Sequence, residues 1–170
     1  MTEIKGFNLL GNNKARVLIL GSMPSVTSLT KHQYYAHPRN AFWRIMAALF
    51  NKDKPLSYQQ GQLLLQTEKI AVWDVLKSCH RLGSLDADIE KDSIEVNDFI
   101  SLFKEFTLLK FVFFNGGTAE LLYKKQVYPH LPIEYKTLSY TLLPSTSPAY
   151  ASMRYEDKLV AWAVLKTCIK

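Results

Sequence analysis

Hydrophobic and polar positions alternate along the chain in a way that predicts strands and helices in turn. Short, mostly apolar runs of the kind that form buried strands occupy Arg16–Leu20, Ile70–Leu76 and Lys110–Phe114, and Tyr135–Leu143 is a more mixed strand. Helical spacing of apolar residues and capping residues predict helices over 40–50, 58–67, 97–106, 118–127 and 154–170. Strands that alternate with helices are typical of an α/β protein.

This order of elements predicts a three-layer α/β/α sandwich around a central, mainly parallel four-stranded sheet. The carboxyl ends of parallel strands share one rim of the sheet, and ligands of such proteins bind there. The predicted loops on that rim are residues 21–40, 74–92, 115–118 and 144–150, and within them 77–92 is a long polar loop. No repeat, low-complexity tract or linker divides the sequence, so residues 1–170 are predicted to form one domain.

The composition indicates the class of protein, and the net charge indicates the kind of partner. The 170 residues are 48% hydrophobic and 21% charged, which is typical of a globular domain. The net charge of +6 fits a polyanionic partner such as nucleic acid. The first residues lack a signal-peptide pattern, and no apolar run has the length of a membrane span, so we expect an intracellular, cytoplasmic protein.

Neither the cysteines nor the histidines have the spacing of a metal site. Cys79 and Cys168 are too few for a disulfide framework or an iron–sulfur cluster, and the four histidines are not closely paired. The chain also lacks the GxxxxGK(S/T) and GxGxxG loops that hold nucleotide phosphates. We therefore expect no metal, no cluster and no cofactor.

The stretch 17–43 is the strongest candidate for a functional loop, although its residues alone leave two interpretations open. A strand leads to a turn, GSMPS at 21–25, and a polar loop rich in aromatic residues then leads into a helix. Gly21 and Pro24 could simply shape the turn while the aromatic side chains pack in the core. Alternatively, the loop could bind a ligand at the rim of the sheet.

Several motifs, in order along the chain, resemble those of the uracil-DNA glycosylase superfamily. They are GSMPS at 21–25, YYAHPRNAFW at 34–43 and LPSTSPAY at 143–150. The segment HPRNAFW is similar to that of the mismatch-specific uracil and thymine glycosylases. Together with IAVWDVLKSCHRLGSLD and FFNGGTA, the motifs most resemble the hypoxanthine-DNA (deoxyinosine) glycosylase branch.

The resemblance implies a monofunctional glycosylase of base excision repair. Such an enzyme flips a deaminated base out of DNA and hydrolyses its N-glycosidic bond, leaving an abasic site. Hypoxanthine is the expected base, with uracil as a second one. The expected partner is DNA that contains a deaminated base, and the superfamily suggests a monomer.

The resemblance also assigns the catalytic residue, with one departure from the usual pattern. Met23 stands where relatives have Asp or Asn, and methionine can neither accept a proton nor orient a water. Asn40 resembles the residue to which catalysis is attributed in the hypoxanthine branch. Because an amide is not an effective base, we expect Asn40 to position water while the DNA phosphates stabilise the oxocarbenium ion. The alternative is that Asn40 only caps its helix.

Base binding is expected to involve Tyr35, Met23, Asp74, Asn115 and His37. Tyr35 lies where relatives place a stacking ring, and His37 is a candidate to polarise a base carbonyl. Asp74 is the outstanding acceptor, because a carboxylate within an apolar strand is costly to bury without a partner.

Two of these residues have an equally simple structural interpretation. Asp74 could instead form a salt bridge with Lys77 or Arg81. Asn115 could donate to the base, or it could merely tolerate a left-handed turn before Gly116.

The serines of the two main motifs are the expected phosphate ligands. Ser25, Ser145 and Ser147 can offer hydroxyl and backbone N–H groups, and Arg81 is an electrostatic contact. A wedge that fills the vacated stack would come from the 146–150 loop. Two other functions remain open: a non-catalytic damaged-DNA-binding module of the same fold, which Met23 would permit, and an α/β enzyme that acts on free nucleosides.

Overall fold

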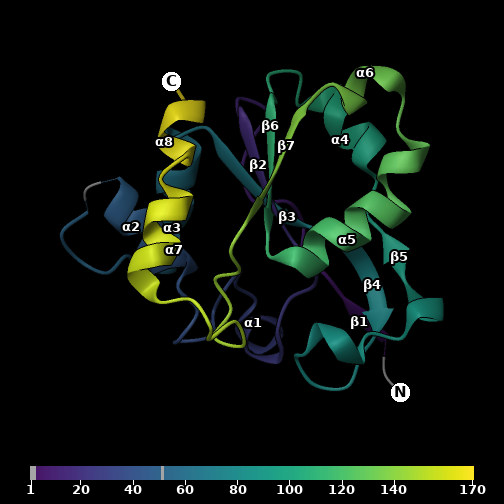
Figure 1. Cartoon of the computed structure of the whole chain (residues 1–170), viewed down its shortest axis with the longest axis horizontal. Coiled ribbons are helices and arrows are strands. Elements are labelled where there is room, and N and C mark those ends of the chain that lie inside the picture. Colours follow the sequence, from purple (N-terminus) through teal and green to yellow (C-terminus); the bar gives the residue numbers. More distant parts are fainter. Residues whose placement is uncertain (1–2, 51) are drawn as a thin grey trace.

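A four-stranded parallel sheet forms the centre of the computed structural model, which describes residues 3–50 and 52–170 (Figure 1). Its strands lie in the order β3-β2-β6-β7, and all three neighbouring pairs are parallel. The bounds are β2 Val17–Gly21, β3 Ile70–Asp74, β6 Phe111–Asn115 and β7 Ser139–Leu143. Every residue of β2 is buried, as expected for an inner strand that is covered on both faces. The predicted parallel sheet is confirmed.

Helices cover both faces of this sheet, which confirms the predicted three-layer sandwich. Helices α2, α3, α7 and α8 lie on one side of it, and α4, α5 and α6 lie on the other (Figure 1). Their bounds are α2 Phe42–Leu49, α3 Tyr58–Thr67, α4 Phe99–Glu105, α5 Gly117–Gln126, α6 Ile133–Lys136, α7 Tyr155–Trp162 and α8 Leu165–Cys168. Each face has its own apolar core, one built around Phe42 and Trp162 and the other around Phe99 and Tyr123. None of the helices in the described residues is long and apolar enough to span a membrane.

Apolar periodicity marks α2, and a cap marks the start of α3. The apolar positions of α2, spaced three and four residues apart, are all buried: Phe42, Ile45, Met46 and Leu49. Ser57 begins α3 with a capping box, in which its hydroxyl accepts from the Gln60 N–H and the Gln60 side chain accepts from the Ser57 N–H.

A second, antiparallel sheet corrects the sequence prediction for residues 70–92. The strand predicted over Ile70–Leu76 ends at Asp74. The first part of the predicted loop 77–92 is instead a strand, β4 (Leu76–His80). It pairs with β1 (Glu3–Lys5) and β5 (Glu95–Val96). Polar residues interrupt β4 at Lys77, Ser78 and His80, so its sequence lacks the continuous apolar run that predicts a buried strand.

Other boundaries also differ from the predictions. Residues 135–143 begin in α6 and become a strand only at Ser139, and 154–170 contains two helices, because the backbone tightens to i→i−3 hydrogen bonds near Ala163. The loop 21–40 contains a short helix, α1 (Val26–Lys31), at the same end of the sheet as the segment after β7 (Figure 1). Three 3₁₀ turns complete the elements: η1 Asp86–Asp88, η2 Lys91–Ser93 and η3 Tyr128–His130.

Candidate active site

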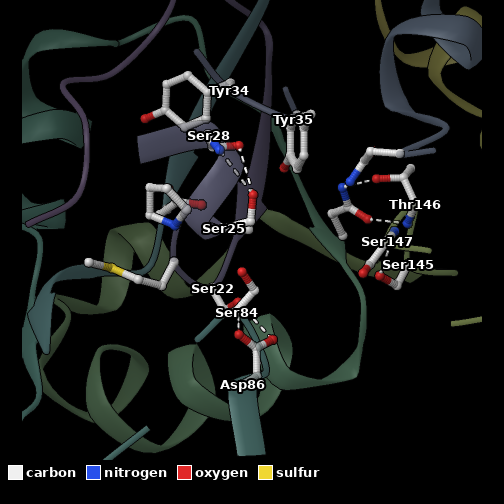
Figure 2. Close-up of a pocket in the computed structure, with 16 residues that line it drawn as sticks. Ser22, Ser25, Ser28, Tyr34, Tyr35, Ser84, Asp86, Ser145, Thr146 and Ser147 are labelled. Carbon is white, nitrogen blue, oxygen red and sulfur yellow. Dashed lines mark hydrogen bonds between the residues drawn. The ribbon is translucent and has the colours of Figure 1, made fainter. Parts of the chain in front are cut away.

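A cavity of about 110 Å³ opens at the carboxyl ends of the parallel strands (Figure 2). This volume is of the same order as the roughly 150 Å³ of a cavity that binds benzene, so the cavity suits a flat aromatic ligand. All four predicted rim loops contribute to its lining, which is Gly21, Ser22, Met23, Pro24, Ser25, Ser28, Tyr34, Tyr35, Asn40, Asp74, Ser84, Asp86, Asn115, Ser145, Thr146 and Ser147.

Serine hydroxyls fold the first loop back on itself beside the cavity (Figure 2). The Ser25 hydroxyl accepts from the Ser28 N–H at 3.1 Å and so caps α1. The buried Ser28 hydroxyl in turn accepts from the Ala36 N–H at 3.2 Å. Ser25 therefore lines the cavity while also fixing the shape of the loop that follows.

Tyr35 forms an aromatic wall of the cavity. Its φ of 54° is left-handed, which is uncommon for an aromatic residue, and its ring stacks on Phe42 with 4.2 Å between centroids. The hydroxyl is buried without a hydrogen-bond partner. Burial, and then the charge of Asp74, raise the pKa of Tyr35, so the hydroxyl stays protonated and available to donate. Tyr34 has a different role, because its hydroxyl donates to the Asn8 carbonyl and its ring packs in the core.

Asp74 ends β3 at the floor of the site and is only 4% exposed. Its Oδ2 has no hydrogen-bond partner. Burial raises the pKa of Asp74 to about 7, with a further rise from the charge of Asp86 and an opposing effect of Arg81. The Asp74 carboxyl and the Tyr35 hydroxyl converge on Gly21, where a Cβ atom would lie 2.5 Å from Asp74 Oδ1 and 3.2 Å from Tyr35 Oη.

The predicted salt-bridge alternative for Asp74 is wrong. Lys77 pairs with Glu95, with 2.6 Å between Nζ and Oε1. Arg81 pairs with Asp86 at 3.7 Å. Both cations are thus committed to other carboxylates, which leaves Asp74 as an unpaired acid within the cavity.

Asn115 and Thr146 hold the two late loops together. The Asn115 amide donates to the Thr146 hydroxyl and accepts from its backbone N–H, each at 2.9 Å (Figure 2). The left-handed turn belongs to Gly116, with φ 98°, so the alternative that Asn115 adopts it is wrong. Thr146 is 1% exposed and was missed from the sequence, where only its place inside the LPSTSPAY motif indicates a role.

Asn40 lies between the cavity and a neighbouring surface hollow and lines both. Its Oδ1 accepts from the Phe42 N–H at 3.0 Å, at the start of α2. This contact is an Asx turn just before the helix, whose N-cap residue is Ala41 and has no side-chain cap. The oxygen keeps a second lone pair and the amide keeps its NH2 donors, so the group can also hold a water. The next N–H, of Ala41, donates to the Thr146 carbonyl at 3.0 Å and joins the first motif to the second.

The other predicted ligands divide into three groups. Ser145 and Ser147 line the cavity, and their hydroxyls accept from the N–H groups two residues further on. Met23 lines it too, with its side chain buried. His37 does not line the cavity, and its Nδ1 accepts from the Arg39 N–H.

Arg81 does not fit the predicted electrostatic contact with phosphate. The side chain is buried, and its guanidinium donates to the carbonyl oxygens of Pro24 and Gly83. Its neighbour Asp86 lines the cavity and was missed from the sequence, because only the tertiary fold brings it to the GSMPS turn. Across residues 3–50 and 52–170, no three His, Cys, Asp or Glu side chains are grouped to hold a metal ion.

The hollow beside Asn40 is basic and aromatic. The Arg44 guanidinium stacks 3.7 Å from the centre of the Tyr155 ring, and Lys158 Nζ donates to the Tyr150 carbonyl at 2.9 Å. These residues and Asn40 line the same hollow. Cations interleaved with aromatic rings next to a ring-sized cavity are suited to a nucleic-acid strand with one base in the cavity.

A family model described as the uracil DNA glycosylase superfamily matches residues 9–166. The chain belongs to this superfamily. The predicted family and enzyme class are thereby confirmed.

Individual relatives agree with the family. A hypoxanthine DNA glycosylase of Methanosarcina barkeri is 39% identical over 113 residues, which are 66% of this chain and 70% of the relative. One of Methanosarcina acetivorans is 35% identical over 116 residues, 68% of this chain and 72% of the relative. A solution NMR structure from Methanosarcina acetivorans, described as a candidate uracil DNA glycosylase, has a TM-score of 0.76 and 29% identity, and the match covers 97% of this chain and 99% of that one.

Proposed function

We propose that this glycosylase removes hypoxanthine from DNA, and uracil as a second base, by hydrolysing the N-glycosidic bond without a covalent intermediate. The observation that carries the proposal is the ring-sized cavity in which an aromatic wall, Tyr35, meets an unpaired buried acid, Asp74. The relatives named as hypoxanthine DNA glycosylases support the choice of base. In this proposal the protein acts as an intracellular monomer and needs no metal or cofactor.

Base recognition follows from the groups that the cavity leaves free. Hypoxanthine and uracil both present a carbonyl oxygen beside an N–H group, and a donor beside an acceptor recognises that edge. Asp74 faces the edge of the flipped base, and the Asn115 amide, which keeps one N–H beyond its bonds to Thr146, donates to a second acceptor. The Tyr35 ring stacks on the base and offsets part of the cost of unstacking it from the duplex.

Water attack depends on Asn40, because Met23 cannot take part in proton transfer. Asn40 is anchored through its oxygen to the Phe42 N–H, which fixes where the rest of the amide can hold a water. The sugar gains positive charge as the bond breaks, much as in glycoside hydrolysis, and the DNA phosphates compensate that charge. Orientation of the water is the contribution of Asn40 to catalysis.

The phosphates of the flipped nucleotide meet the serine-rich loops. Ser25, Ser145 and Ser147 line the cavity and have hydroxyl protons to donate to phosphate oxygens. The cations of the neighbouring hollow, Arg44 and Lys158, attract the adjoining strand. Tyr150, in the loop proposed to supply the wedge, is 39% exposed.

The test uses end-labelled duplexes that carry one hypoxanthine or one uracil. Wild type and Asn40→Ala are incubated with each duplex, which is then treated with alkali to break abasic sites. We expect breaks at hypoxanthine with wild type, a loss of about a hundredfold or more in Asn40→Ala, and unchanged affinity for the duplex.

Two outcomes would contradict this proposal. If wild type binds the duplex and leaves both bases in place, the protein is a damaged-DNA-binding module whose chemistry was lost with Met23. If Asn40→Ala retains full activity, Asn40 serves only α2 and the water is held elsewhere.

A further inference from the structure

The segment after β4 is fastened to the GSMPS turn, and this brings a second acid to the cavity. Arg81 donates to the Pro24 carbonyl, and the Ser22 hydroxyl lies 2.8 Å from both carboxylate oxygens of Asp86 (Figure 2). Arg81 Nη1 is 3.7 Å from Asp86 Oδ1. A surface segment that only connected β4 to β5 would not need these contacts with the first motif.

Burial raises the pKa of both acids that line the cavity, but Asp86 is the better stabilised of the two in its charged form. The Ser22 hydroxyl and the Arg81 cation oppose the rise for Asp86, whose side chain is 32% exposed. Asp74 is almost fully buried, and its Oδ2 has no donor. When two neighbouring acids have environments that differ in this way, one takes the proton and the other keeps the charge. Here the proton belongs on Asp74 and the charge on Asp86.

The other groups around Asp74 do not change this assignment. Burial raises the pKa of Tyr34 and of Tyr35, so both hydroxyls are neutral. Arg81 favours the charged form of Asp74 but is itself paired with Asp86. The pKa of Asp74 is raised, first by burial and then by the charge of Asp86, which agrees with a neutral Asp74.

Resting on the proposed function, we infer that Asp86 is a positioning residue that keeps Asp74 in its neutral carboxylic acid form for base recognition. A neutral carboxyl has an O–H donor next to a C=O acceptor, which matches the carbonyl and N–H of hypoxanthine in a two-point contact. An ionised carboxylate has only acceptors and repels the base carbonyl. Asp86 thus acts through like-charge repulsion and contacts Ser22 and Arg81, while Asp74 contacts the base.

The experiment measures kcat/KM on a duplex that carries one hypoxanthine from about pH 5.5 to about 8.5, on both sides of the Asp74 titration. Wild type is compared with Asp86→Asn, which keeps the size of the side chain and its acceptor for Ser22. Asp88→Asn is the matched control, because Asp88 belongs to the same 3₁₀ turn, is exposed and does not line the cavity. Asp74→Asn, with a permanent donor and acceptor, completes the set.

We expect wild type and Asp88→Asn to lose activity as the pH rises through neutrality. In Asp86→Asn this loss begins at lower pH. If it begins one pH unit lower, kcat/KM in the range where activity falls is about tenfold below that of wild type. In Asp74→Asn the loss disappears, so at about pH 8.5 this variant is more active than wild type.

The inference is overturned if kcat/KM depends on pH in the same way in Asp86→Asn and Asp88→Asn. It is also overturned if Asp74→Asn is inactive at every pH, because the carboxyl would then be needed in its charged form. Should Asp86→Asn not fold, the Asp74→Asn profile decides alone. If wild type releases no hypoxanthine at any pH, the proposed function itself is wrong. That result differs from one in which wild type is active but Asp86→Asn loses activity over the same pH range as wild type.

Discussion

At the scale of single residues, the site is distinguished by polar groups that the fold leaves unsatisfied. Within the described chain, the buried side-chain atoms without a partner are Tyr35 Oη, Asp74 Oδ2 and Arg81 Nη1. Two of the three line the cavity. Each such atom costs about 1–3 kcal/mol in the free protein, and a ligand of complementary shape recovers that energy.

Asp74 should make the stability of the protein depend on pH. Its pKa is 3.8 for a free side chain and about 7 in the fold, so the folded state binds the proton more tightly than the unfolded state. The resulting stabilisation is complete below pH 3.8 and is lost as the pH rises to about 7. Asp74→Asn should therefore gain up to about 4 kcal/mol relative to wild type between acid and pH 8.

Urea unfolding of both proteins at a series of pH values measures this gain. The comparison of one variant with wild type cancels the contribution of the other acids. A difference in unfolding free energy that stays constant with pH would show that Asp74 titrates normally and is not an unpaired buried acid.

The residues of the site could be predicted only where local sequence carries the information. Asp74 interrupts an apolar strand, and Tyr35 lies where relatives place a stacking ring, so both could be assigned to the rim before the structure. Thr146 and Asp86 could not, because their roles come from contacts with Asn115 and Ser22, which lie 31 and 64 residues away. Arg81 is predicted as an electrostatic contact with phosphate since arginine is seldom buried, and here backbone carbonyls hold it inside.

At the scale of elements, α1 connects loop shape to activity. Ser25 caps this helix, and the helix supplies Ser28, whose hydroxyl anchors the backbone just after Tyr35 by accepting from the Ala36 N–H. The cap of α3, Ser57, does similar work and does not line the cavity. The two serines therefore form a matched pair.

Ser25→Ala and Ser57→Ala should each destabilise the protein by about 1 kcal/mol, the usual value of an N-cap. Ser25→Ala should also lower the rate of base release severalfold, because the loop that carries Tyr35 loosens, whereas Ser57→Ala should not. Thermal unfolding and single-turnover kinetics measure the two effects. Equal rates in the two variants would argue against a link between α1 and the site.

Elements whose apolar residues form a continuous run or a helical period could be predicted, and elements with mixed apolar and polar residues could not. The buried strands β2 and β6 have continuous apolar runs, and α3 has both a cap and a periodic face. By contrast, β4 is mixed in polarity and β1 is three residues long, so neither sequence differs from that of a loop. Antiparallel pairing of this kind depends on partners that are distant in sequence.

At the scale of the whole molecule, two groups of cations lie at opposite ends of the sheet. Arg39, Arg44 and Lys158 line the hollow beside the cavity. Lys14, Arg16, Lys69 and Lys110 gather near the amino ends of the parallel strands, at the opposite end of the sheet. Only the first group adjoins the rim where a flipped base would enter.

Arg44→Ala should weaken binding to any duplex and lower the slope of log K against log salt by about one, the effect of one lost phosphate contact. Lys110→Ala removes the same charge at the other end and should leave the slope unchanged. Titrations of a labelled duplex at several salt concentrations measure both. If the two variants behave alike, net charge and not the hollow governs DNA affinity.

The hydrogen bonds that build the cavity also have a consequence for the order of folding. They join Ser22 to Asp86, Arg81 to Pro24 and Asn115 to Thr146, across 64, 57 and 31 residues. Ala41 is joined to Thr146 across a still longer segment. None of these contacts can form until both of its partners have been synthesised and brought together. A partly synthesised chain therefore has no cavity, and a newborn molecule cannot excise bases until its last strand has joined the sheet.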